Sequence, residues 1–210
     1  MIEQFDLDPD FDHEIQPQYN ICPNESAWVI NSDRKLSRMA WGVNFKTPYK
    51  TNPNFVINSR QEDLLERQYF KDAFFKYERC LIPADSFYEF EKTPGKTAYR
   101  FIPTNGLGWL FAGLKLTDQT NNIKKFVILT TEANQVVAKV HDRMPVIIDP
   151  SNMSKWFQAN HYRPNNPNLL PIDNHLINTM TVDPIVRKVS SKGPQCHQSF
   201  IPKDYFDWLL

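Results

Sequence analysis

The segment of residues 79–90, which reads RCLIPADSFYEF, constrains the fold of this chain more than any other. Its apolar run Cys80–Ile82 predicts a short strand, a proline and an aspartate interrupt that strand, and Ser86–Phe90 predicts a second one. Glu89 lies in the second strand among aromatic residues, although glutamate is disfavoured in strands and is rarely buried without a partner. Glu89 is therefore either a surface or ion-paired carboxylate, or a pocket residue with a chemical role.

Length and composition predict a single domain over residues 1–210. Hydrophobic residues make up 41% of the chain, which is enough for one core. Predicted strands outnumber the short predicted helices, and the alternating strand–helix pattern of parallel sheets does not occur. We therefore expect an α+β fold, with curved antiparallel sheets that form a barrel-like core and short helices at its periphery.

The charge balance and the cysteines argue against several classes of protein. Lys plus Arg and Asp plus Glu each number 24, so a nucleic acid would have to bind a local basic patch. The three cysteines lack CxxC spacing, which argues against a disulfide framework or a structural zinc site. No apolar run could span a bilayer, and neither a signal peptide nor a glycine-rich phosphate loop occurs. We expect a cytoplasmic protein without metal, cofactor or membrane contact.

Local patterns predict the remaining elements. Ser59 and Glu62 have capping-box spacing, so a helix is expected to begin there, and Arg60 lies beside amides that would suit an anion. From this pattern alone, Arg60 could equally be a solvated surface residue. The other expected elements are a helix in Met1–Leu7, a packed loop at Gln18–Pro23, a hairpin of Ala27–Asn31 and Leu36–Val43, a helix face at Phe70, Ala73, Phe74 and Tyr77, strands at Ala98–Ile102, Trp109–Leu116, Phe126–Thr131, Val146–Ile148, Met180–Val182 and Ile185–Val189, a helix at Ala133–Val140 capped by Thr130 or Thr131, and a helix from Asp149 through Phe157.

Five polar residues stand out in apolar segments or at loop ends: Asn20, Asn58, Arg60, Glu89 and His141. Glutamate and histidine can share general acid–base work near neutral pH, asparagine can orient a substrate oxygen, and arginine can hold a phosphate. His141 could equally staple a loop through its neighbours Asp142 and Arg143. Cys80 could form a thiol–imidazole pair with His141, or it could be a buried structural thiol.

Seven motifs stand in the chain in an order and with a spacing that resemble the SRAP family (SOS response-associated peptidases, abasic-site processing proteins). The resemblance covers nearly the whole chain from residue 18, and the tail from Val182 to Cys196 is similar too. The motifs are QYNICP from Gln18, WG at Trp41, INSRQE from Ile57, RCLIPADSFYEF from Arg79, AGL from Ala112, TTEA from Thr130 and HDRMPV from His141.

This resemblance implies a chemistry and a set of site residues. The family acts on abasic sites in single-stranded DNA: it removes its initiator Met, and the exposed N-terminal cysteine forms a Schiff base and then a thiazolidine crosslink. By position, Glu89 and His141 would move protons and Asn58 would orient the reacting group. Arg60 would bind a phosphate, and Trp41 and Pro23, with Asn20 nearby, would contact the splayed bases. The implied partner is single-stranded DNA with abasic sites, bound by a monomer that associates with the nucleoid during DNA damage.

The beginning of the chain departs from the family pattern Met-Cys-Gly-Arg, because it reads Met1-Ile2-Glu3-Gln4. One hypothesis is that the true start lies upstream, so that the strand carrying the cysteine is missing. A second is a natural variant that binds abasic DNA without closing a thiazolidine. In that variant Cys22 is either a substitute thiol or a packed loop cysteine. A third is a peptidase that uses a thiol or a Glu/His pair.

Overall fold

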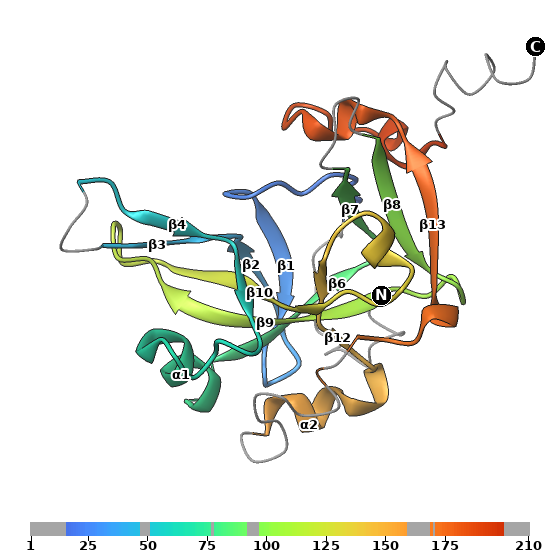
Figure 1. Cartoon of the computed structure of the whole chain (residues 1–210). Helices are drawn as coiled ribbons and strands as arrows, with labels where there is room; N and C mark the ends of the chain where they lie inside the picture. The colour runs from blue at the N-terminus through green and yellow to red at the C-terminus, as the bar shows by residue number, and fades with distance from the viewer. Residues whose placement is uncertain are drawn as a thin grey trace, which may run out of the picture.

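The computed structural model describes residues 16–46, 51–76, 78–91, 97–158, 169 and 171–199 (Figure 1). These residues form a mixed α+β fold of mostly antiparallel sheets with few short helices, which confirms the predicted class. The helix expected in Met1–Leu7 lies outside the described residues. Within the described ranges, no helix has the length and apolarity that a membrane crossing requires.

An eight-stranded sheet forms the centre of the molecule. Its hydrogen-bonded order is β11-β10-β9-β6-β1-β2, with β12 also paired to β9 and β5 paired to β10. The predicted hairpin is confirmed, because β1 and β2 pair in antiparallel fashion: Ser26 lies opposite Ala40, and Ile30 lies opposite Leu36. The bounds of these strands are β1 Ser26–Ile30, β2 Leu36–Ala40, β5 Asn58–Arg60, β6 Arg79–Ala84, β9 Trp109–Thr117, β10 Lys124–Glu132, β11 Arg143–Pro145 and β12 Ile147–Ile148.

Two smaller sheets flank the central one (Figure 1). On one side β7 Phe87–Phe90, β8 Ala98–Pro103 and β13 Ile177–Val182 form a sheet in the order β13-β8-β7. On the other side β3 Val43–Phe45 and β4 Asn54–Val56 form a two-stranded arm. The segment 79–90 therefore contributes one strand to the central sheet and one to the three-stranded sheet, with the turn at Asp85 between them.

The curved antiparallel sheets do not close into the expected barrel. After β2 a bridge joins Trp41 to Phe126 of β10, and the Gly42 N–H donates to the Phe126 carbonyl at 2.8 Å. Gly42 has φ +103°, a left-handed conformation, and a Cβ there would lie 2.3 Å from the Phe55 ring. The chain thus bends away into the arm instead of continuing as a closing strand.

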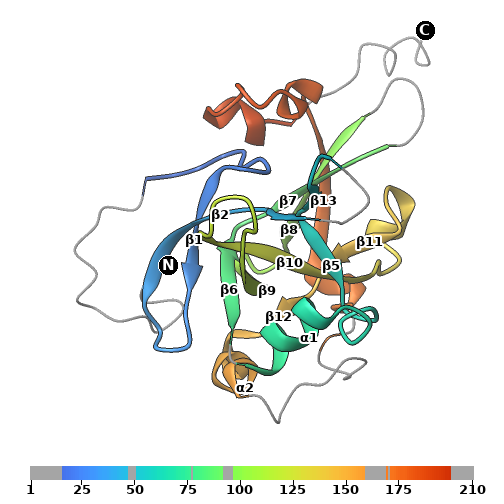
Figure 2. The same ribbon diagram turned by 90° about the vertical axis from the view of Figure 1, so that its left-hand side faces the viewer.

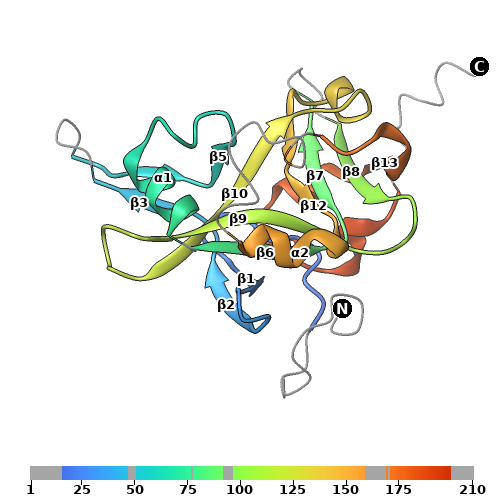
Figure 3. The same cartoon turned by 90° about the horizontal axis from the view of Figure 1, so that it is seen from below.

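The helices are short and pack against the central sheet. Figure 2 shows α1, Gln68–Phe75, and α2, Met153–Phe157, close together at the lower end of the view, and Figure 3 shows α2 beside β6. Phe70, Ala73 and Phe74 are buried, which confirms these three residues of the predicted core face; the fourth, Tyr77, lies outside the described residues. The 3-10 helices are Val137–Lys139, Pro150–Asn152, Asn174–Leu176, Pro184–Arg187 and Pro194–His197.

The helix expected to begin at Ser59 is wrong. Residues 58–60 form β5, which pairs in parallel with β10, so that Ser59 lies opposite Leu129. The chain then turns, and α1 begins at Gln68. Pairing with β10 outweighs the local capping pattern, because a capping box is a weak signal beside tertiary hydrogen bonds.

Two further local predictions fail, and one holds. Residues 184–187 form a 3-10 helix instead of the expected strand, because Asp183 accepts a hydrogen bond from the Ile185 N–H. The helix expected over Ala133–Val140 shrinks to the 3-10 turn Val137–Lys139, and the Asn134 side chain before it accepts from the Val137 N–H. Thr130 and Thr131 cannot cap it, since both lie inside β10. The Asp149 cap is confirmed by its hydrogen bond from the Ser151 N–H.

Candidate functional site

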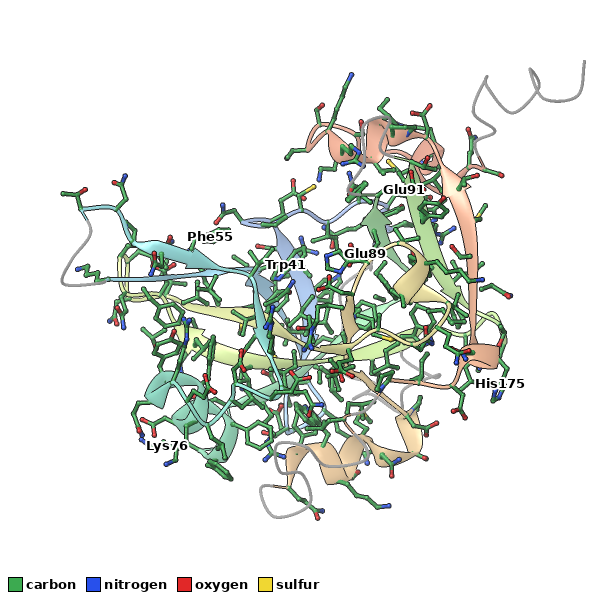
Figure 4. All side chains as sticks on the ribbon, in the orientation of Figure 1. Trp41, Phe55, Lys76, Glu89, Glu91 and His175 are labelled. Atoms are coloured by element: carbon green, nitrogen blue, oxygen red, sulfur yellow. The ribbon has the colours of Figure 1, made fainter. Side chains whose placement is uncertain are left out.

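A cleft of about 660 Å³ opens between the central sheet and the three-stranded sheet. Its lining comes from the loop at residues 16–23, from part of the C-terminal segment, and from β1, β5, β6, β7, β9, β10 and β11 with the residues next to them. Figure 4 labels Trp41, which lies between the arm and the three-stranded sheet, and Glu89, which lies on β7 of that sheet. Of the seven sequence-predicted site residues, six line this cleft: Asn20, Pro23, Trp41, Asn58, Glu89 and His141.

Glu89 and His141 meet in the cleft although 52 positions separate them in the chain. Glu89 is the third residue of β7, and His141 lies in the loop before β11. The Glu89 Oε1 atom lies 3.8 Å from the His141 Nδ1 atom, and the two side chains are 24% and 31% exposed. This separation exceeds a hydrogen bond, but one small movement or one water could carry a proton across it.

The loop around His141 fixes the orientation of its ring. The Arg143 N–H donates to the His141 Nδ1 atom at 3.1 Å, and the Asp142 Oδ1 atom lies 3.5 Å from the same nitrogen. The Arg143 carbonyl oxygen lies 3.2 Å from the same Nδ1 atom, so the ring accepts from the Arg143 N–H in one tautomer and donates to the Arg143 carbonyl in the other. The staple through Asp142 and Arg143 is therefore present, and it places the ring beside Glu89.

An arginine that the sequence reasoning did not single out as a site residue also lines the cleft. Both terminal nitrogens of Arg143 donate to the Glu62 carboxylate, at 3.1 and 2.8 Å, and Nη2 donates to the Thr130 carbonyl at 2.7 Å. Burial alone would raise the pKa of Glu62, but the hydrogen bonds and charge of Arg143 lower it. A signal for Arg143 was available, because Arg143 stands in the same HDRMPV motif as His141, two residues after it.

Asn58, Trp41 and Pro23 lie where they could contact a ligand in the cleft. Asn58 is exposed on β5, and Pro23 is exposed at the end of the N-terminal loop. The Trp41 indole is half-buried, and its Nε1–H donates to the Ile57 carbonyl at 2.9 Å, which fixes the ring. These three residues offer an amide and two apolar surfaces within one cleft.

Asn20 also lines the cleft, but its amide is committed elsewhere. The side chain is buried, and its Nδ2 atom donates to the carbonyls of Val186 at 2.9 Å and Ser191 at 3.0 Å. These bonds tie the loop at residues 16–23 to the C-terminal segment and so build one wall of the cleft. The geometry supports a structural part for Asn20 in this wall, not a direct contact with bases.

Arg60 does not line the cleft, although it lies on its margin. It is exposed, and it shares one face of β5 with Asn58, which does line the cleft. The anion site expected at a helix N-terminus is wrong, because no helix begins at Ser59. A phosphate could reach Arg60 only from the exposed face of β5.

The cysteines differ in what they can do. Cys80 is fully buried and does not line the cleft that His141 lines, and burial raises its pKa to about 12, so the structure favours the buried structural thiol over the thiol–imidazole pair. Cys22 is half-buried at the cleft, and the Lys192 Nζ atom lies 3.6 Å from its Sγ atom. Lys192 also donates to the Glu25 carboxylate at 2.5 Å, so this corner is a packed polar cluster.

Comparison with known proteins assigns the family. The family model described as SOS response associated peptidase (SRAP) matches residues 1–192, so the chain belongs to the SRAP family. The abasic site processing protein YoaM of Bacillus subtilis is 33% identical over 190 residues, covering 82% of this chain and 81% of its own. The abasic site processing protein HMCES of Xenopus tropicalis is 25% identical over 253 residues, covering 93% and 73%.

Solved structures support the fold. A crystal structure of a protein from Bacteroides thetaiotaomicron matches with a TM-score of 0.71 at 18% identity, covering 85% of this chain and 82% of the other. A phage-related protein from Bordetella bronchiseptica matches with a TM-score of 0.63 at 24% identity, covering 86% and 88%.

Proposed function

We propose that this chain binds single-stranded DNA that contains an abasic site and processes the ring-opened sugar in the cleft. Glu89 and His141 move the protons, and Asn58 orients the reacting oxygen. The observation that carries the proposal is the 3.8 Å approach of Glu89 to His141 in a cleft that Asn58 also lines. The names of the relatives, abasic site processing proteins, support the same substrate.

The proposed chemistry begins with an amine of the chain and the aldehyde of the opened sugar. The amine nitrogen bonds to the carbonyl carbon, a proton moves from nitrogen to oxygen, and loss of water leaves an imine. Glu89 and His141 suit these transfers, since one can accept the proton from nitrogen and the other can donate one to the leaving hydroxyl. Closing a thiazolidine on this imine would need a thiol on the carbon next to the amine carbon. The step that Glu89 and His141 support is the imine itself, and we propose that it is reversible.

The proposed DNA contacts favour a single strand. Trp41 and Pro23 offer surfaces on which unpaired bases could stack, a mode of binding that tolerates any sequence. Arg60 would bind a phosphate beside the cleft. Each contact comes from one chain, so we propose that a monomer is sufficient.

A trapping experiment tests this function. The 210-residue chain is incubated with end-labelled single-stranded DNA carrying one abasic site, with or without borohydride, and then run on a denaturing gel. We expect an adduct only after reduction, because borohydride converts the imine to a stable amine. The Glu89→Gln variant should lower the trapping rate by about 100-fold or more, the usual contribution of general acid–base catalysis.

Matched controls separate site chemistry from general effects. Glu91→Gln changes a carboxylate two residues along that bonds the Tyr99 hydroxyl at 2.9 Å and does not line the cleft, so its rate should match wild type. DNA without an abasic site should give no adduct. Equal trapping by wild type and the Glu89 variant would overturn the roles proposed here, and a heat-stable adduct without borohydride would overturn the reversible imine.

A further inference from the structure

We propose that Phe55, on the two-stranded arm, is a stacking platform for one unpaired base of the DNA strand, outside the cleft and next to Trp41. The inference deepens the proposed function and rests on it, because it assigns a position to a base beyond the reacting nucleotide. Phe55 does not line the cleft, and none of the seven family motifs contains it.

Phe55 exposes an aromatic ring that the fold already holds in place. The residue is 40% exposed, although it is the central residue of β4. Its ring packs on Gly42, where an added Cβ would lie 2.3 Å from the Phe55 Cζ atom and 2.6 Å from Cε2. Contact with the backbone of the arm limits the motion of the ring, so it has little conformational freedom to lose when a base stacks on it.

The exposed ring lies on the side of the molecule where the cleft opens. Asn44 lies opposite Phe55 in the arm, so these two residues share one face, and Val43 and Phe45 lie on the other. Val43 and Phe45 are buried in the core cluster that includes the buried face of α1. Phe55 therefore points away from α1, toward the side of the central sheet where Trp41 lines the cleft.

Trp41 connects Phe55 to the cleft. It directly precedes Gly42, on which the Phe55 ring packs. Its indole Nε1–H donates to the carbonyl of Ile57, two residues after Phe55. Figure 4 labels Phe55, Trp41 and Glu89 in that order from the arm toward the three-stranded sheet. Proteins that bind single strands use such successive aromatic side chains for successive bases, so a strand with its reacting sugar beside Glu89 would reach Phe55 past Trp41.

The surroundings of Phe55 fit a single base better than a protein partner. Asn54 precedes it in β4 and Asn44 lies opposite, so the ring stands between two polar residues. A stable protein interface covers about 800 Å² on each partner, whereas one base needs only the surface of one ring. We therefore assign the surface to unpaired DNA.

A binding experiment without reaction tests the inference. The probe is labelled single-stranded DNA with one tetrahydrofuran residue, a baseless sugar that cannot open to an aldehyde, and fluorescence anisotropy measures its affinity. Phe55→Ala should weaken binding about 5- to 100-fold, because base–aromatic stacking contributes about 1–3 kcal/mol per base and 1.4 kcal/mol is tenfold. Phe55→Trp should bind at least as tightly as wild type. Phe55→Leu keeps an apolar contact with Gly42 but lacks a ring, so it should lose most of the same affinity.

A second tetrahydrofuran residue, moved along the strand, locates the contact. At one position, on one side of the first, Phe55→Ala should bind as well as wild type, because the base that stacks on the ring is gone. Phe75→Ala is the matched control and should bind like wild type, because Phe75 is 39% exposed but lies on α1.

Three results would overturn the inference. They are equal affinities of wild type and Phe55→Ala, a Phe55→Ala effect that persists at every position of the second baseless residue, and an equal loss in Phe75→Ala. A Phe55→Ala variant that changes oligomeric state but not DNA affinity would assign the ring to a protein contact instead. If wild type binds the probe as expected but does not trap reactive abasic DNA, the proposed imine chemistry fails and the stacking site stands.

Discussion

Two clusters of charged residues in this molecule have opposite designs. Around Asp118, where β9 turns into β10, every contact is short: the carboxylate accepts from Lys125 at 2.8 Å, from the Asn44 amide at 2.9 Å and from the Thr120 N–H at 2.9 Å. Asp118 is fully buried. In the cleft, Glu89 and His141 stand 3.8 Å apart and are partly exposed.

The difference separates a cluster that holds the fold from one that can meet a ligand. Burial of Asp118 alone would raise its pKa, but the hydrogen bonds from Lys125, Thr120 and Asn44 hold that pKa well below its usual range. Because its pKa is so low, the Asp118 carboxylate stays charged near neutral pH and neither takes up nor releases a proton there. A loose and partly exposed pair costs little stability and leaves room for a reacting group.

The largest effect on stability should come from breaking the cluster around Asp118. Asp118→Ala leaves the Lys125 charge nearly buried without its partner, and we expect a loss of about 3–5 kcal/mol in the free energy of unfolding. Glu89→Gln should change that free energy by about 0.5 kcal/mol or less. Urea unfolding at neutral pH measures both. Equal losses in the two variants would remove the distinction between the clusters.

The second-largest effect should come from acid, which weakens the cluster around Asp118. Because the folded-state pKa of Asp118 is lowered, its contribution is fully present well above the unfolded pKa of about 3.9 and is lost as the pH falls through that value toward the folded pKa. The lowered pKa of Glu62 acts in the same direction. Urea unfolding between neutral pH and pH ~3.5 should show stability falling with pH, and falling less in Asp118→Asn. An identical slope in both proteins would contradict the assignment.

Local patterns predicted much of the fold because most strands carry their own signal. The strands β1, β9 and β10 follow from β-branched and aromatic runs between turns, and β2 follows from its place after the turn at residues 31–34. The strand around Ser59 was not predicted, because β5 is only three residues long and is held by parallel pairing to β10, a long-range contact. The extra strand β11, Arg143–Pro145, is likewise set by pairing to β10.

The candidate site was predictable in composition but not in detail. Glu89 was recognisable as a carboxylate on an aromatic strand, and the motif resemblance brought in His141 and Asn58. No local sequence pattern predicted that Arg143 binds Glu62, 81 positions away. None predicted that the Asn20 side-chain amide donates its hydrogen bonds to carbonyls near residue 190. Those contacts depend on how distant segments pack, which spacing along the chain does not encode.

Two asparagines sharpen the comparison at a smaller scale. Asn20→Ala removes hydrogen bonds to the Val186 and Ser191 carbonyls, and we expect a loss of about 1–3 kcal/mol in the free energy of unfolding. Asn58→Ala, at an exposed position, should cost about 0.5 kcal/mol or less yet slow the trapping of abasic DNA. Urea unfolding and the trapping gel measure the two effects. A stable Asn20 variant, or an Asn58 variant that traps at the wild-type rate, would contradict these assignments.

The smallest effect should come from Arg60, at the margin of the cleft that Glu89 and His141 line. If Arg60 binds one phosphate of a single strand, Arg60→Ala should lower the slope of log affinity against log salt by about 0.7. Fluorescence anisotropy with labelled single-stranded DNA, over a series of salt concentrations, measures this slope. Arg67→Ala is the matched control, because Arg67 also lies outside the cleft lining and donates to the Tyr69 hydroxyl at 2.9 Å. A slope that changes equally in both variants would assign the phosphate to general surface charge, and Arg60 would then belong to neither cluster.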